Sequence, residues 1–191
     1  TLTSWNALMM KGYIDAYKAF QVPEYLNAAQ KNAQFLINHQ LQNNGALNHS
    51  YKDGKSTING YLEDYAAVID AFIALYEVTL NELWINKANE LAAYTFENFF
   101  DTEKNMFYFT SKEDEKLVAR NFEYRDNVIP ASNSMMAKNL LILSHHFDNK
   151  KYLTTSSKML HNVQPEIESY PSAYSNWLDL MANFQDNFYE V

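Results

Sequence analysis

The sequence predicts an all-α fold, an (α/α) toroid of helical hairpins with short β-hairpin connections. Three times, an aromatic residue that opens an amphipathic helix stands 20 residues after the start of a more apolar helix, at offsets of 59 and 68 residues between units. Repeats of this length are two-helix hairpins that bury a core by stacking on their neighbours. Only 4 Gly and 4 Pro interrupt 191 residues, which favours long helices. The three pairs are Trp5 and Tyr25, Asp64 and Trp84, and Ser132 and Tyr152.

The two helices of each unit differ in pattern. The first is apolar nearly all round, as is typical of a helix covered on several sides, and runs from Trp5 to Phe20, from Tyr65 to Tyr76 and around Leu140. The second has one apolar stripe and one polar face, which is typical of a half-exposed helix. An inner ring of helices wrapped by an outer ring fits this alternation.

The connections that lead from an outer helix to the next inner helix are predicted to be β-hairpins. The first follows Leu47–Tyr51 with Asp53-Gly54, and Asp-Gly is the strongest short hairpin signal. The second is expected to pair Met106–Thr110 with Leu117–Arg120. Both must lie at the end of the toroid where the inner helices begin, so we expect the functional site there.

A last helix of the inner type, from Ala173 to Phe184, has no outer partner after it. An open arc would expose apolar inner faces around Trp177 and Met181, which a soluble monomer rarely tolerates. We therefore expect residues 1–191 to be one barrel fragment, about half of a closed barrel. The other half would lie upstream or come from a second copy of the chain.

Composition excludes several classes of function. The net charge is −8 and no basic run occurs, which argues against a nucleic-acid partner. No apolar run approaches a membrane span and no signal peptide is visible, so we expect no membrane partner and a cytoplasmic location. Cysteine is absent, which excludes a disulfide, a thiol nucleophile and a cysteine metal site in this chain. No cofactor and no metal are expected, because no metal-ligand spacing occurs.

Polar residues gather at the predicted inner-helix starts. They are Ser4 and Asn6, Glu63 and Asp64, and Ser132 to Ser134. Because the repeat places them equivalently, they should converge on one mouth with side chains from the connections. Carboxylates, amides, aromatics and arginines in a concave mouth suit a polyhydroxylated ligand. The alternative is that these residues only cap helices, since Ser, Asp and Asn are preferred there.

Asp64 is the candidate catalytic carboxylate, together with Asp126 or with a carboxylate outside this chain. Glu63 points roughly 100° away from Asp64 on a helix, so the adjacent pair is a poor acid–base pair by itself. Arg120, Arg125 and Asp126 could instead form an ordinary ion-pair cluster. His49 is the one histidine expected on the mouth side. The candidate substrate-binding residues are Trp5, Asn6, Tyr51, Glu63, Tyr65, Arg120, Arg125 and Asn133.

Five segments stand out along the chain: Leu2–Met9, Tyr51–Lys55, Leu62–Ala66, Phe100-Asp101 with Phe107 and Phe109, and Ile129–Ser134. In order and spacing, these segments resemble the C-terminal part of thioredoxin-domain-containing proteins of the spermatogenesis-associated kind. The resemblance implies the C-terminal half of a six-hairpin barrel, similar to N-acylglucosamine 2-epimerases and six-hairpin glycosidases, with a thioredoxin-like domain outside this chain.

Two functions compete on this basis. The first is a carbohydrate-associated barrel that binds or acts on a sugar at the inner-helix mouth, by glycosidase-like or epimerase-like chemistry. Epimerases need histidines that exchange a proton beside a carbonyl, and no inner-helix start supplies one, which weakens that reaction. The second is a scaffold barrel that presents clients to the thioredoxin-like domain. In either case this chain alone is expected to be inactive.

Overall fold

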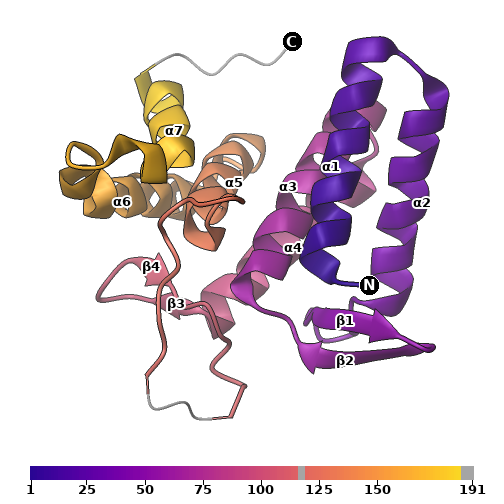
Figure 1. Ribbon diagram of the computed structural model, residues 1–191, viewed down its shortest axis with the longest axis horizontal. Helices are drawn as coiled ribbons and strands as arrows, with labels where there is room; N and C mark the ends of the chain where they lie inside the picture. Colours follow the sequence, from indigo (N-terminus) through magenta and orange to yellow (C-terminus); the bar gives the residue numbers. More distant parts are fainter. Residues whose placement is uncertain (116–118, 186–191) are drawn as a thin grey trace.

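The computed structural model describes residues 1–115 and 119–185, and it confirms the predicted toroid of helical hairpins. The inner helices are α1 (Thr3–Phe20), α3 (Leu62–Thr79), α5 (Ser132–His146) and α7 (Ser175–Gln185), the last preceded by the short 3-10 helix η1 (Pro171–Tyr174). The outer helices are α2 (Pro23–His39), α4 (Glu82–Asn98) and α6 (Lys150–Ile167). Figure 1 shows them as successive antiparallel pairs along an arc.

Contacts between helices follow the inner and outer rings. α3 packs against α1 on one side and α5 on the other, and α7 continues the inner ring beyond α5. Each outer helix packs on the inner helix that precedes it: α2 on α1, α4 on α3 and α6 on α5. Because α3 is covered by three helices, its residues from Asp64 to Ile69 and from Ala71 to Leu75 are all buried, as its all-round apolar sequence predicts.

The first predicted hairpin is confirmed. Strand β1 (Asn48–Lys52) pairs antiparallel with β2 (Lys55–Asn59), and Lys52 lies opposite Lys55. Asp53 and Gly54 between them have φ values of +50° and +78°, the left-handed pair that a two-residue hairpin turn requires.

Gly60, just after this hairpin, is required for a close approach. Its N–H donates to the main-chain oxygen of Leu47, and a Cβ built on Gly60 would lie 2.7 Å from that oxygen. This contact fixes the path by which the hairpin returns to the start of α3.

The second hairpin differs from the prediction. Strand β3 (Phe100–Asp101) pairs with β4 (Met106–Phe107), so the turn comes earlier than expected. The Asp101 carboxylate accepts hydrogen bonds from the N–H groups of Glu103 and Lys104, which turns the chain back at once. Leu117 and Val118 of the predicted partner strand lie outside the described residues, as does Lys116 of the turn predicted before it.

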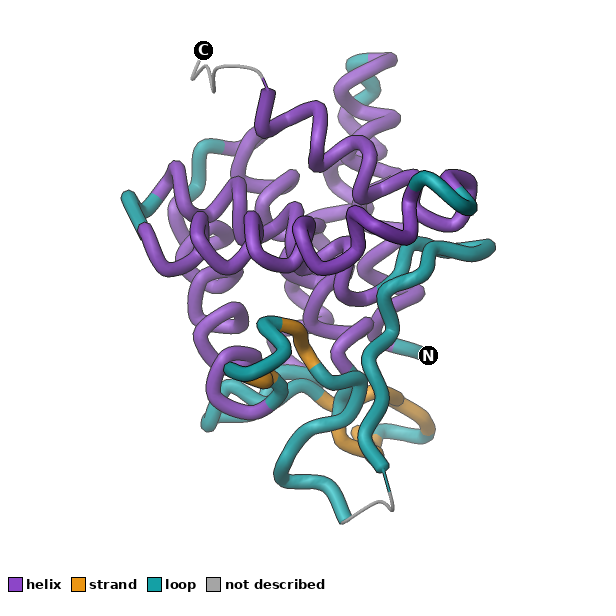
Figure 2. Tube along the Cα trace, turned by 90° about the vertical axis from the view of Figure 1, so that its left-hand side faces the viewer, coloured by secondary structure: helices purple, strands orange, loops and turns teal. Residues whose placement is uncertain are grey.

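The strands and the long connections gather at one end of the helices, as Figure 2 shows, and the N-terminus lies at the same end. This is the end where inner helices begin, so the predicted mouth exists as a place in the fold. No helix in residues 1–115 and 119–185 has the length and apolar character needed to cross a membrane.

The exposed apolar flank is not where the sequence placed it. Trp177 is fully buried and Met181 is partly buried, because α7 packs on α5 and α6. The bare stripe runs along the outer edge of α1 instead, where Trp5, Met9 and Phe20 are 65%, 59% and 71% exposed. Gly12 and Ala16 lie between them at helical spacing, so this face of α1 carries no charged residue.

Candidate functional site

Asp64 lies at the first turn of α3 and is completely buried. Its Oδ1 accepts a hydrogen bond from the N–H of Ser4 on α1 at 2.9 Å, and its Oδ2 accepts one from the N–H of Tyr61 at 2.9 Å. Burial raises the pKa of this carboxyl, and the hydrogen bonds from His49, Tyr61 and Ser4 act in the opposite direction. Asp64 therefore joins the starts of two neighbouring inner helices.

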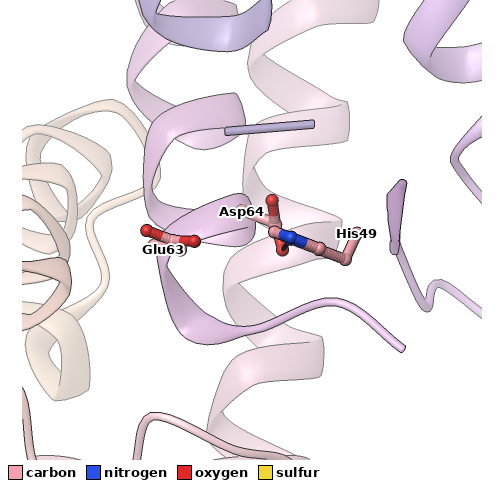
Figure 3. A group of neighbouring side chains, drawn as sticks. All are labelled: His49, Glu63 and Asp64. Carbon is pink, nitrogen blue, oxygen red and sulfur yellow. Dashed lines mark hydrogen bonds and ion pairs between the residues drawn. The ribbon is translucent and has the colours of Figure 1, made fainter. Parts of the chain in front are cut away.

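His49 completes the contacts of Asp64. Its Nδ1 lies 2.9 Å from Asp64 Oδ2, and Figure 3 shows the imidazole directed at this carboxylate from strand β1. An ionised Asp64 carboxylate can only accept, so the tautomer of His49 that matches it carries its proton on Nδ1 and leaves Nε2 to exchange a proton. The His49 side chain is 15% exposed, and its ring contacts that of Tyr61 at 4.9 Å.

Glu63 stands beside this pair with a half-buried side chain. His49, Glu63 and Asp64 each offer one side-chain atom of a kind that can bind a metal ion, and these three atoms lie within 4.8 Å of one another (Figure 3). Burial raises the pKa of the Glu63 carboxyl, and repulsion by Asp64 and Glu123 acts in the same direction, while His49 acts against it. The mouth thus contains a carboxyl group that holds its proton more tightly than usual.

Asp126 lies in the connection that leads to α5 and, like Asp64, accepts hydrogen bonds at the starts of two inner helices. Its Oδ1 accepts hydrogen bonds from the Ala131 N–H at 2.9 Å and the Ser134 hydroxyl at 2.6 Å, both at the start of α5. Its Oδ2 accepts one from the N–H of Asn176 on α7 at 2.9 Å. The two aspartates predicted to be catalytic therefore act as similar clamps from different positions, Asp64 between α1 and α3 and Asp126 between α5 and α7, and they do not meet in one acid–base pair.

Tyr65 and Asn133 occupy equivalent positions in the repeat, 68 residues apart, and each ties an inner-helix start to the connection before it. The Tyr65 hydroxyl accepts a hydrogen bond from the N–H of Leu47 at 2.8 Å. The Asn133 side chain accepts from the Phe107 N–H and donates to the Phe107 oxygen, both at 2.9 Å. Both side chains are fully buried, so they hold the mouth in shape from below.

The two arginines are engaged away from Asp64. Arg120 donates to the main-chain oxygen of Thr110 and lies over the ring of Tyr108, 4.1 Å from its centre. Arg125 pairs with Glu166 at 2.6 Å and donates to the Tyr174 hydroxyl at 3.0 Å, so its ion-pair partner is Glu166 and not Asp126.

Arg125 also borders a surface cavity of about 380 Å³, which Asp126, Tyr170 and Ser172 line further.

The remaining predicted binding residues differ in exposure. Trp5 is open to solvent at the start of α1. Asn6 donates to the Leu2 oxygen at 2.6 Å, a contact within its own helix start. Tyr51 packs its ring against Phe35 on α2, 5.2 Å between ring centres. Of these three, Trp5 is the one whose ring is free to stack on a ligand.

His49 lies at the mouth, as the sequence predicts, but its contact with Asp64 has no signal in the sequence. The two are 15 residues apart and lie on different elements, a strand and a helix, so no motif spacing joins them. The expectation that no histidine stands at an inner-helix start overlooked the hairpin, which brings one there from the side. The signal was the Asp53-Gly54 turn, because it folds β1 back against the start of α3.

The fold and the position of the mouth define a class, the (α/α) six-hairpin toroids. A cellobiose 2-epimerase from Bacillus thermoamylovorans superposes with a TM-score of 0.71 at 13% identity, over 86% of this chain and 45% of the epimerase chain. A glycoside hydrolase family 76 mannosidase from Bacteroides thetaiotaomicron gives 0.71 at 14%, over 84% and 43%. A D-mannose isomerase gives 0.68 at 16%, over 85% and 40%. These likenesses establish the fold.

Relatives found by sequence similarity point to a narrower group of proteins than the shared fold does. Spermatogenesis-associated protein 20 of Homo sapiens is 28% identical over 200 residues, and that of Mus musculus is 29% identical over 200 residues. Each match covers all of this chain and 25% of the relative, so the chain spans about a quarter of the length of these proteins. No family model matches the chain. The resemblance stated from the sequence is thereby confirmed.

Proposed function

We propose that the toroid to which this chain contributes binds a carbohydrate at the inner-helix mouth and transfers a proton on it, with His49 as the acid–base group and Asp64 as its positioning residue. The observation that carries the proposal is the 2.9 Å contact between His49 Nδ1 and the buried Asp64 carboxylate. A buried carboxylate that fixes the tautomer of a partly exposed histidine is a recurrent way to prepare a general base.

The chemistry that fits is isomerisation or epimerisation of a sugar. In isomerisation, Nε2 of His49 would take the proton from C2 and return it to C1, while Glu63 passes the proton of the C2 hydroxyl to the carbonyl oxygen. In epimerisation, His49 would take the proton from one face of C2 and a second acid, for which Glu63 is at hand, would protonate the other face, so neither reaction needs an oxidant. Glu63 supplies a second proton-transfer group, since its raised pKa keeps it closer to neutrality. Trp5 would stack on the sugar ring, because its own ring is free.

Structural neighbours support the choice of ligand class. Proteins described as an epimerase of cellobiose, an isomerase of D-mannose and a mannosidase share this fold. An α-1,6-mannanase of Salegentibacter is described as inactive when two adjacent aspartates are replaced, and Glu63-Asp64 is likewise an adjacent acidic pair. A glycosidase would use Glu63 with a second carboxylate, for which Glu123 is the neighbour at hand.

The test is turnover by the full-length protein. Interconversion of D-mannose and D-fructose, epimerisation of cellobiose and hydrolysis of an aryl mannoside would be measured for the parent and for His49→Gln. We expect the first or second reaction, and a loss of at least about 100-fold in His49→Gln, the lower range for a general base. His161→Gln, an exposed histidine on α6, is the control and should keep full activity. Equal turnover by parent and His49→Gln would refute the role of the histidine.

We also propose that the toroid is completed by a second half-barrel, from elsewhere in a longer protein or from a second copy. The structural neighbours are more than twice as long as the segment that superposes, and the part of the α1 edge away from the mouth, with Met9 and Phe20, suits a further helix. A scaffold function, in which the barrel presents clients to a thioredoxin-like domain, is the alternative. It would be supported by a full-length protein that retains clients but turns over no sugar.

A further inference from the structure

α3 leaves a single line of its surface open. From Glu63 to Leu75, only Glu63 and Asp70 are not buried. These residues are seven apart, so they lie on the same face of the helix, about 10 Å from each other along its axis. Ala67 and Ala74 lie on the same face but are buried, so Glu63 and Asp70 are the partly exposed positions of this face. Because α1, α5 and α4 cover the other sides of α3, the open line faces the concave side of the arc.

The neighbouring inner helices carry a charge at the same level. The repeat offsets of 59 and 68 residues that relate the helix starts also relate Lys11, Asp70 and Lys138. On α5, Lys138 is the only residue from Ser132 to Leu141 that is not buried. Lys138 forms an ion pair with Asp179 on α7. We call Lys11, Asp70, Lys138 and Asp179 the charged belt; its signs alternate from helix to helix.

Within the belt, Asp70 is the member whose hydrogen-bonding capacity is unused. Lys11 pairs with Asp15 on its own helix at 2.8 Å, and Lys138 pairs with Asp179. In the described part of the chain, no donor lies within hydrogen-bonding or ion-pair distance of the Asp70 carboxylate. Burial raises the pKa of Asp70, and the attraction of Lys11 and Lys138 offsets this in part. An unpaired carboxylate in such a place is costly for folding alone.

We propose that the charged belt is the floor of the ligand site and that Asp70 binds hydroxyl groups of an uncharged polyol. The inference rests on the proposed carbohydrate function and adds the depth and the charge of its ligand. The belt holds two lysines and two aspartates, and Asp15, which pairs with Lys11, adds a further negative charge beside it, so the floor carries no excess positive charge. A hydroxyl can donate to Asp70 and accept from a lysine. An anionic group would be repelled by Asp70, and a cationic group would be repelled by both lysines.

The experiment is calorimetric titration of the full-length protein with five probes. D-mannose and cellobiose are the uncharged probes, D-mannose 6-phosphate and D-glucuronate are anionic, and D-glucosamine is cationic. The parent, Asp70→Asn and Glu77→Gln are compared. Glu77 is the matched control, because it lies on the same face of α3 one further step away from the mouth and pairs with Lys18.

We expect an uncharged probe to bind the parent, at least tenfold weaker binding by Asp70→Asn, and unchanged binding by Glu77→Gln. The melting temperature of Asp70→Asn should be equal to or above that of the parent, since an unpaired, partly desolvated carboxylate is removed. Equal affinity of Asp70→Asn and parent would overturn the inference and leave the proposed function intact, and so would tighter binding of a charged probe. A lowered melting temperature would assign Asp70 to the structure. No binding of any probe would overturn the proposed function itself.

Discussion

Replacing Asp64 by Asn tests the clamp at the start of α3. The amide keeps one oxygen for the Ser4 N–H but turns an NH2 group toward two donors, the Tyr61 N–H and His49. Two hydrogen bonds to a charged group are lost, worth about 1.5–3 kcal/mol each, although relief of the buried charge offsets part of this. We expect a net loss of about 3 kcal/mol, which lowers the melting temperature of a domain of this size by about 6–12 °C.

The assay is thermal and urea unfolding followed by circular dichroism. Asp126→Asn should lose a similar amount, because its carboxylate also accepts from three donors across two helices. Asp53→Asn is the control: this residue is exposed in a turn with positive φ, which Asn tolerates, so its stability should not change. A melting temperature of Asp64→Asn within about 1 °C of the parent would contradict the clamp, since that corresponds to less than about 0.5 kcal/mol.

Three further outcomes follow from local contacts. Gly60→Ala should lower the free energy of unfolding by about 1–3 kcal/mol, because its Cβ would collide with the main chain. Gly12→Ala has open space around it and should raise the free energy of unfolding by up to about 1 kcal/mol. Urea unfolding of both variants measures these changes. Glu166→Gln should lower the melting temperature at neutral pH. Hydrogen bonds from Tyr174 and Arg125 lower the pKa of Glu166. Its contribution to stability is therefore present above about pH 4.5, the ordinary pKa, and is lost as pH falls through the lowered pKa. A difference in melting temperature between variant and parent that persists at pH 2 would contradict this. Trp5→Ser should reduce binding of a hydrophobic dye by the isolated chain, and dye binding equal to the parent would show that the α1 edge is covered.

The architecture could be predicted because it depends on periodicity. All-round apolar and one-sided helices alternate along the chain, and Asp53-Gly54 specifies its own turn. The second hairpin was misplaced because the turn after Asp101 depends on side-chain hydrogen bonds to the backbone, which hydrophobic patterning does not reveal. The exposed flank was assigned to α7 for a similar reason: the packing of Trp177 against its neighbours is a tertiary contact without a local signal.

The position of the candidate site could be predicted, but the hydrogen bonds between its residues could not. Equivalent polar residues at the helix starts indicated the mouth, and the structure brings His49, Glu63 and Asp64 together there. Which carboxylate would be fully occupied by hydrogen bonds depends on the contact between Asp64 and Ser4, 60 residues apart. The same residue types, Ser, Asp and Asn, serve to cap a helix and to bind a ligand, so their burial in the folded structure is needed to tell the two roles apart.

The contacts of Asp64 and Asp126 bear on how such a repeat protein can be shortened, lengthened or rearranged. The first turn of α1 depends on Asp64 of the next hairpin, 60 positions away, and the first turn of α7 depends on Asp126 in the connection before α5, 50 positions away. A cut or an insertion made between such partners would leave every helix intact and still deprive a buried carboxylate of a donor, at a cost of a few kcal/mol. Exchange of one unit therefore requires its neighbour to supply the matching donor or carboxylate.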